Sequence, residues 1–138
     1  MNIAVRYHTR GGNTKKVAEA IARAVGAAAG DCDVPIAGPV DLLFLGGSVY
    51  GFGLDDAVKN FIARLNPSEV KAVALFGTSA IVKTGNRDMA KLLRERGIAV
   101  LGKDFYCRGE FTVMHRGRPD AGDLSRAAEF AGDAAKGL

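Results

Sequence analysis

Two nearly continuous apolar runs, residues 40–45 (VDLLFL) and 70–76 (VKAVALF), most limit what this chain can fold into. Runs of this kind are typical of strands that are buried on both faces of a parallel sheet. Such a sheet needs helices over both faces and right-handed crossovers between its strands. The two runs therefore predict an α/β fold.

The remaining pattern adds the other elements of that fold. Residues 3–7 alternate like a strand, residues 31–36 form at best a short edge strand because they contain Pro35, and residues 98–101 with 105–111 predict a last, interrupted strand. Apolar residues three and four apart predict helices over 17–25 and 54–65, a third that Asn86 can cap, and a terminal helix that starts at Asp120 or Asp123. About five strands and four helices make one domain over residues 1–138.

Length and composition favour a globular protein with a full core. The chain has 138 residues, of which 48% are hydrophobic, and this content separates it from disordered sequences. It contains neither a long apolar run nor a basic-then-apolar leader at its start, so we expect a cytoplasmic protein without a membrane span.

Charge and reactive residues argue against several other classes of protein. The net charge of +4 suits acidic ligands. The basic residues are spread along the chain, and the seven Phe and three Tyr lie mostly in core-like contexts. We therefore predict no nucleic-acid-binding surface. Cys32 and Cys107 share no metal or redox spacing and are expected to be free thiols. Neither His8 nor His115 has a partner at the spacing of a triad or a metal site.

The polar loop 9–14 (TRGGNT) lies between the first predicted strand and the first predicted helix. A strand, a tight loop and a helix together aim backbone N–H groups and the positive helix end at an anion. Adjacent Gly11 and Gly12 do not fit the dinucleotide pattern G-x-G-x-x-G, and the triphosphate ending G-K-S/T is absent. Thr9, Asn13 and Thr14 can donate to phosphate oxygens. The alternative is a glycine turn that caps an ordinary helix.

This loop resembles the phosphate loop of the flavodoxin-like family, Ser/Thr-x-Ser/Thr-G-x-T. Thr9, Gly12 and Thr14 match the pattern, whereas Gly11 replaces a usual hydroxyl. The stretches LLFLGGSVYGFG, ALFGTSA and DFYCRGEF are similar to later strands and loops of short-chain members. The resemblance implies a doubly wound five-stranded parallel sheet with strand order 2-1-3-4-5, and FMN as the cofactor.

The resemblance also implies the residues that bind FMN. Arg10 belongs to the phosphate loop, although Arg10, Lys15 and Lys16 are expected to act through their field rather than by direct contact. Tyr50 is the expected stacking partner of the flavin ring, with Phe52 as a substitute, because the chain has no Trp. The implied FMN-binding residues are Thr9, Arg10, Gly11, Gly12, Asn13 and Thr14 for the phosphate, and Gly47, Ser48, Val49, Tyr50, Gly51, Gly77, Thr78, Ser79 and Ala80 for the ring.

Three functions remain open at this point. The first is an FMN-binding electron carrier that works between redox partner proteins. The second is an FMN-dependent NAD(P)H oxidoreductase acting on a quinone or a similar small acceptor, with one flavin face open to nicotinamide. The third is a cofactor-free binding module that keeps the fold. No catalytic residue and no metal site are predicted for any of the three.

Overall fold

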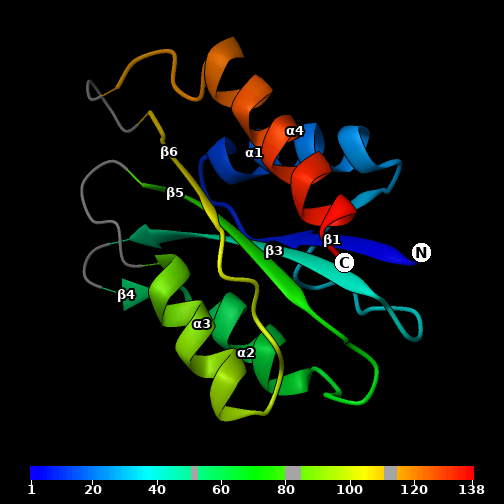
Figure 1. Ribbon diagram of the computed structural model, residues 1–138. Coiled ribbons are helices and arrows are strands. Elements are labelled where there is room, and N and C mark those ends of the chain that lie inside the picture. Colours follow the sequence, from blue (N-terminus) through cyan, green and yellow to red (C-terminus); the bar gives the residue numbers. More distant parts are fainter. Residues whose placement is uncertain (51–52, 80–84, 111–114) are drawn as a thin grey trace.

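The computed structural model describes residues 1–50, 53–79, 85–110 and 115–138, with the backbone alone for 48–50. The described residues form a sheet between two helical layers, with α1 and α4 over one face and α2 and α3 over the other (Figure 1). The strands are β1 (Ile3–Tyr7), β2 (Ala29–Asp31), β3 (Leu42–Tyr50), β4 (Gly53–Leu54), β5 (Val73–Ser79) and β6 (Phe105–Arg108). The helices are α1 (Asn13–Val25), α2 (Asp56–Arg64), α3 (Gly85–Glu95) and α4 (Ala121–Lys136).

The sheet has the predicted topology. Its strand order is β2-β1-β3-β5-β6, and all four of these pairings are parallel. When only the parallel strands are numbered along the chain, this is the order 2-1-3-4-5. The short strand β4, which the sequence analysis did not predict, pairs antiparallel with the end of β3.

Alternation along the apolar runs builds two cores, one on each face of the sheet. Leu42 and Phe44 pack with α1 and α4, whereas Leu43 and Leu45 pack with α2 and α3. All four side chains are fully buried. The predicted burial of this strand on both faces is therefore confirmed, because successive side chains of a strand point to opposite faces.

Local capping explains where two of the helices begin. Asp55 caps α2 by accepting a hydrogen bond from the Ala57 N–H at 3.0 Å. Asp120 caps α4 and forms a reciprocal capping box with Asp123, so both predicted start residues take part. The prediction that Asn86 caps α3 is wrong, because the helix already includes Gly85 and the Asn86 amide donates instead to Asp104 and to the Phe105 carbonyl.

Several strand bounds differ from the prediction. The edge strand lies at 29–31 rather than 31–36. The Arg6 guanidinium packs on Gly30 of this strand and donates to the Val34 and Pro35 carbonyls of the chain that follows it. β3 and β5 continue through the glycines that were predicted to start loops, because both strands have a partner on each side. β6 ends at Arg108, short of the predicted 111, and Phe111 lies outside the described residues.

Candidate functional site

The predicted loops meet at one edge of the sheet, where the parallel strands have their carboxyl ends (left in Figure 1). The strand register aligns Tyr7 with Gly46, Ser48 with Thr78, and Thr78 with Cys107. In open α/β sheets ligands bind outside this edge, at the point where the strand order reverses. Here that point lies between β1 and β3. From β1 the chain moves outward to β2, and from β3 it moves in the opposite direction to β5 and β6.

The predicted FMN-binding residues that the structure describes lie at this edge. Loop 9–14 leaves β1, Gly47 to Tyr50 form the end of β3, and Gly77 to Ser79 form the end of β5. Gly51, Phe52 and Ala80 lie outside the described residues, as do the side chains of Ser48, Val49 and Tyr50. The ring-stacking role of Tyr50 therefore stays a prediction.

The backbone of the first loop is open beside the start of α1. Gly12 precedes the first residue of α1 in the left-handed conformation, with φ of 92°, which favours glycine. Among the described residues, a Cβ on Gly11 or Gly12 would meet no atom within 4 Å apart from chain neighbours, so the loop is open on that side. The first turn of α1 holds no acidic residue. Its N–H groups and the positive end of the helix dipole are thus compatible with a phosphate.

The polar side chains of the loop form hydrogen bonds within the loop and to other parts of the protein. The Thr9 hydroxyl accepts a hydrogen bond from the Gly12 N–H at 2.9 Å. The Asn13 amide donates to the Glu110 carbonyl at 2.9 Å, and the Thr14 hydroxyl lies 2.8 Å from the Thr78 hydroxyl, with both threonines buried. These bonds tie the loop to β5 and to the chain that follows β6, so they hold its backbone in place.

A second connection joins the loop to the start of α2. The Arg10 guanidinium donates to Asp55 Oδ2 from Nε at 3.0 Å and from Nη2 at 2.7 Å, and His8 Nε2 lies 3.4 Å from Asp55 Oδ1. The hydrogen bond from the Ala57 N–H, helped by Arg10 and His8, holds the pKa of Asp55 below its usual value. Sequence reasoning missed this cluster. The position of Asp55 just before α2 could have identified it as a helix cap. No local sequence pattern indicates its pairing with Arg10, which lies 45 residues away.

The ends of β3 and β5 show why they carry glycines. A Cβ on Gly47 would lie 3.3 Å from Val58, and one on Gly77 would lie 2.8 Å from Asn86 Oδ1 and 3.2 Å from the Gly47 carbonyl. Both glycines thus face the α2–α3 layer, and their lack of a side chain is explained by packing there. Their backbones remain at the predicted ring edge.

Tyr106 adds a polar group to the same edge that the sequence analysis did not single out. Its hydroxyl lies 2.5 Å from the Ser79 hydroxyl, and Arg108 Nη1 donates to it at 3.2 Å. The Arg108 guanidinium also lies over the tyrosine ring, 5.8 Å from its centre. Ser79 is therefore held by β6, as Thr78 is held by α1.

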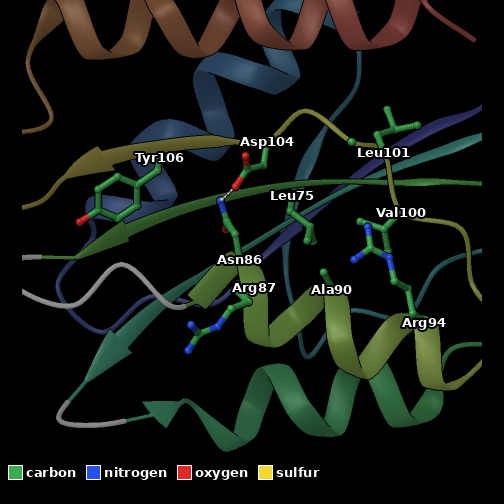
Figure 2. Close-up of a pocket in the computed structure, with 10 residues that line it drawn as sticks. Leu75, Asn86, Arg87, Ala90, Arg94, Val100, Leu101, Asp104 and Tyr106 are labelled. Carbon is green, nitrogen blue, oxygen red and sulfur yellow. Dashed lines mark hydrogen bonds between the residues drawn. The ribbon is translucent and has the colours of Figure 1, made fainter.

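The hollow shown in Figure 2 lies beside this edge rather than within it. It measures about 450 Å³ and runs between α3 and residues 100–106, with the Asn86–Asp104 hydrogen bond across it. Asn86 Oδ1 is buried and has no hydrogen-bond partner among the described residues, but it faces Gly77 of the sheet rather than the hollow.

The described ranges contain neither a metal-binding cluster nor a membrane-spanning helix. Across them, no three His, Cys, Asp or Glu side chains gather closely enough to hold a metal ion. In the same ranges, none of the helices combines the length and the apolar character that crossing a membrane requires.

Burial raises the pKa of both Cys32 and Cys107 to about 12, so these thiols stay protonated and unreactive at neutral pH.

A doubly wound sheet with an anion-binding loop after its first strand is the architecture of a flavodoxin. The sequence pattern of the flavodoxin domain family matches residues 4–105. The chain therefore belongs to the flavodoxin domain family, a membership that implies a flavin cofactor, typically FMN.

Solved structures with the same fold are distant in sequence. A flavodoxin from the domain Archaea is 19% identical, with 99% of this chain and 97% of that chain covered and a TM-score of 0.81. Oxidised flavodoxin 2 from Bacillus cereus is 16% identical over 100% of both chains, with a TM-score of 0.76. Two-electron reduced flavodoxin from Megasphaera elsdenii is 22% identical over 91% of this chain and 97% of that one, with a TM-score of 0.61. A comparison with curated protein sequences found no significant match.

Proposed function

We propose that this protein binds FMN non-covalently and carries electrons between redox partner proteins. The observation that carries the proposal is loop 9–14, which presents an open glycine backbone and the acid-free start of α1 at the switch point of the sheet. Family membership supports the same cofactor. Two of the relatives are described in the oxidised and the two-electron reduced state, which is in keeping with a redox role.

The residues of the chain would divide the work of holding the cofactor. The N–H groups of the phosphate loop and of the first turn of α1 would bind the phosphate, and Lys15 and Lys16 would add a positive field from exposed positions. The ends of β3 and β5 would line the ring. The flavin itself supplies the chemistry, because it accepts and releases electrons, while the protein supplies position and electrostatics.

The visible absorption spectrum tests the proposal. Purified protein is incubated with FMN and freed of excess by gel filtration, and we expect a flavin spectrum that elutes with the protein. The matched control is riboflavin, which has the same ring but no phosphate and should be retained less. A folded protein that retains no FMN would contradict the proposal and favour the cofactor-free module.

The second open function has a test of its own. NADH or NADPH is added without air to the FMN-loaded protein, and the flavin absorbance is followed. For a carrier we expect no rapid bleaching without a partner reductase. Bleaching within seconds would instead favour an NAD(P)H oxidoreductase, and quinone added next would then restore the absorbance.

A further inference from the structure

Asp55 joins two segments of the predicted cofactor edge through one carboxylate. It follows β4 directly and thus ends the β3–β4 hairpin that carries the second predicted flavin segment. Its two oxygens accept hydrogen bonds from the Ala57 N–H of α2 and from the Arg10 guanidinium of the phosphate loop, and His8 Nε2 lies 3.4 Å from Oδ1. The Asp55 side chain is 9% exposed and that of Arg10 is 62% exposed, so the carboxylate is largely shielded from water whereas the guanidinium is not.

We propose that His8, Arg10 and Asp55 form a latch that fixes the phosphate loop against the second flavin segment before the cofactor binds. In this proposal Asp55 is a positioning residue, and Arg10 acts through Asp55 instead of contacting the phosphate directly. The proposal rests on the proposed function for its cofactor, but the latch itself is a property of the protein without ligand.

The other loop contacts explain why such a latch is needed. Asn13 and Thr14 hold the carboxyl half of the loop to the Glu110 carbonyl and to Thr78. The preceding part of the loop, residues 9–12, contains Gly11 and Gly12, and glycine loses more conformational freedom than any other residue when it is fixed. The Thr9–Gly12 hydrogen bond closes this part of the loop on itself, and the Arg10–Asp55 pair anchors it to another element.

Two opposite effects would follow from loss of the Asp55 charge. Removing a carboxylate near a bound phosphate favours binding of the phosphate. Because the Arg10 side chain is 62% exposed and salt screens the field at this edge, the gain in affinity is a few-fold at most. Without Asp55 the backbone around Gly11 must be ordered again at binding, and fixing the backbone of one residue costs about a factor of ten in affinity. The second effect is larger, so affinity should fall.

Asp55→Asn is the variant that isolates the latch. Asn caps helices as well as Asp does, so α2 keeps its start while the charge for Arg10 is lost. Arg10→Gln removes the other half of the pair. Asp41→Asn is the matched control, because Asp41 pairs with Lys71 at 3.0 Å at the start of β3, at the opposite edge of the sheet.

The first experiment measures dissociation constants for FMN and riboflavin. We expect Asp55→Asn and Arg10→Gln each to weaken FMN binding about tenfold, with riboflavin changed less than about twofold and Asp41→Asn unchanged for both. The double variant should be no weaker than the weaker single variant, because both changes break one contact. If Arg10→Gln binds FMN more weakly than the wild type while Asp55→Asn binds it equally or more tightly, Arg10 contacts the phosphate. If a variant loses the same affinity for FMN and for riboflavin, the pair has a general structural role. Either result overturns the latch.

The second experiment needs no cofactor. Trypsin cleaves after Arg10 only when that side chain leaves Asp55, so limited proteolysis followed by mass spectrometry reports on the latch directly. We expect the Arg10–Gly11 bond to be cut at least about fivefold faster in Asp55→Asn than in the wild type or in Asp41→Asn. Equal rates would overturn the latch. Failure of the wild type to bind FMN would overturn the proposed function and leave this cleavage result to decide the latch alone.

Discussion

At the scale of single residues, Thr14 connects the phosphate loop to the sheet. Its buried hydroxyl shares a hydrogen bond with Thr78, which is itself buried at the end of β5. The motif made Thr14 a predicted phosphate donor, and the structure adds a second task, because the same hydroxyl fixes the first turn of α1 on β5. Either task requires the hydroxyl.

Thr14→Val should therefore weaken both FMN binding and folding. We expect at least about tenfold weaker FMN binding, which corresponds to about 1.4 kcal/mol. We expect a loss of about 1–2 kcal/mol in the free energy of unfolding, because the Thr78 hydroxyl loses its buried partner. Fluorescence titration with FMN and urea unfolding measure the two effects, and Thr14→Ser, which keeps the hydroxyl, is the control. Unchanged FMN affinity in folded Thr14→Val would show that the phosphate lies elsewhere.

Asp123 is a second residue whose charge supports the fold. Its fully buried carboxylate receives both Arg118 and Arg126, as well as the Asp120 N–H at 2.9 Å. The Arg118 hydrogen bond, with help from the Asp120 N–H and from Arg126, lowers the pKa of Asp123 from 3.8 to about 2. Since the pKa is lower in the folded protein, the stabilisation is complete above the unfolded pKa and is lost as the pH falls through the folded one.

Wild-type stability should thus fall between about pH 4 and pH 2 in part through Asp123. The lowered pKa corresponds to about 2 kcal/mol, and Asp123→Asn should lack this part of the pH dependence. Urea unfolding at steps from pH 6 to pH 2.5 measures it. Parallel pH profiles for the two proteins would contradict the assignment, and Asp133→Asn, which changes an aspartate of the same helix α4, is the control.

At the scale of elements, glycines have opposite effects in the sheet and in the last helix. Gly46 lies in the centre of β3, and a Cβ there would come within 2.0 Å of the Phe76 ring. Gly132 lies inside α4, where a Cβ would meet no described atom within 4 Å beyond its chain neighbours and the backbone of its own helix. The first glycine is required by packing, whereas the second only weakens its helix.

Gly46→Ala should destabilise the protein by about 2 kcal/mol or more, because the Phe76 ring and the strand backbone must shift. Gly132→Ala should stabilise it by about 0.5–1 kcal/mol, because alanine favours the helix and restricts the unfolded chain. Urea unfolding of both variants checks the two signs. A neutral Gly46→Ala would mean that β3 and β5 do not pack at the described spacing.

At the scale of the whole molecule, the candidate cofactor site is built from elements that are far apart in the sequence. Loop 9–14, the ends of β3 and β5 and the chain after β6 meet only in the folded protein. A ligand that binds this edge binds only the folded state, so it must raise the apparent stability.

FMN at a hundred times its dissociation constant should add about 2.7 kcal/mol. For a chain of this length, that gain raises the midpoint of thermal unfolding by roughly 8 °C. Circular dichroism at 222 nm during heating measures the shift, and the same concentration of riboflavin should give a smaller one. Equal shifts with FMN and riboflavin would argue that the phosphate loop contributes no affinity.

The sequence alone was sufficient for features that depend on near neighbours. The apolar run at 40–45 predicted a strand buried on both faces, the spacing of apolar residues located four helices in the described chain, and Asp120 or Asp123 was the predicted start of α4. The order of the elements and the loop motif then identified the family. These signals are local because a strand or a helix repeats within a few residues.

Only the tertiary structure decided how the edge is held together. β3 continues through Gly47 because it stays paired with β5, and β5 continues through Gly77 because it is paired with both β3 and β6; this pairing outweighs the poor strand propensity of glycine. Asp55 meets Arg10, and Asn13 meets the Glu110 carbonyl, because parallel strands bring their carboxyl ends to one edge. Such contacts depend on the register between strands, and the register is a property of the folded sheet rather than of any single stretch of sequence.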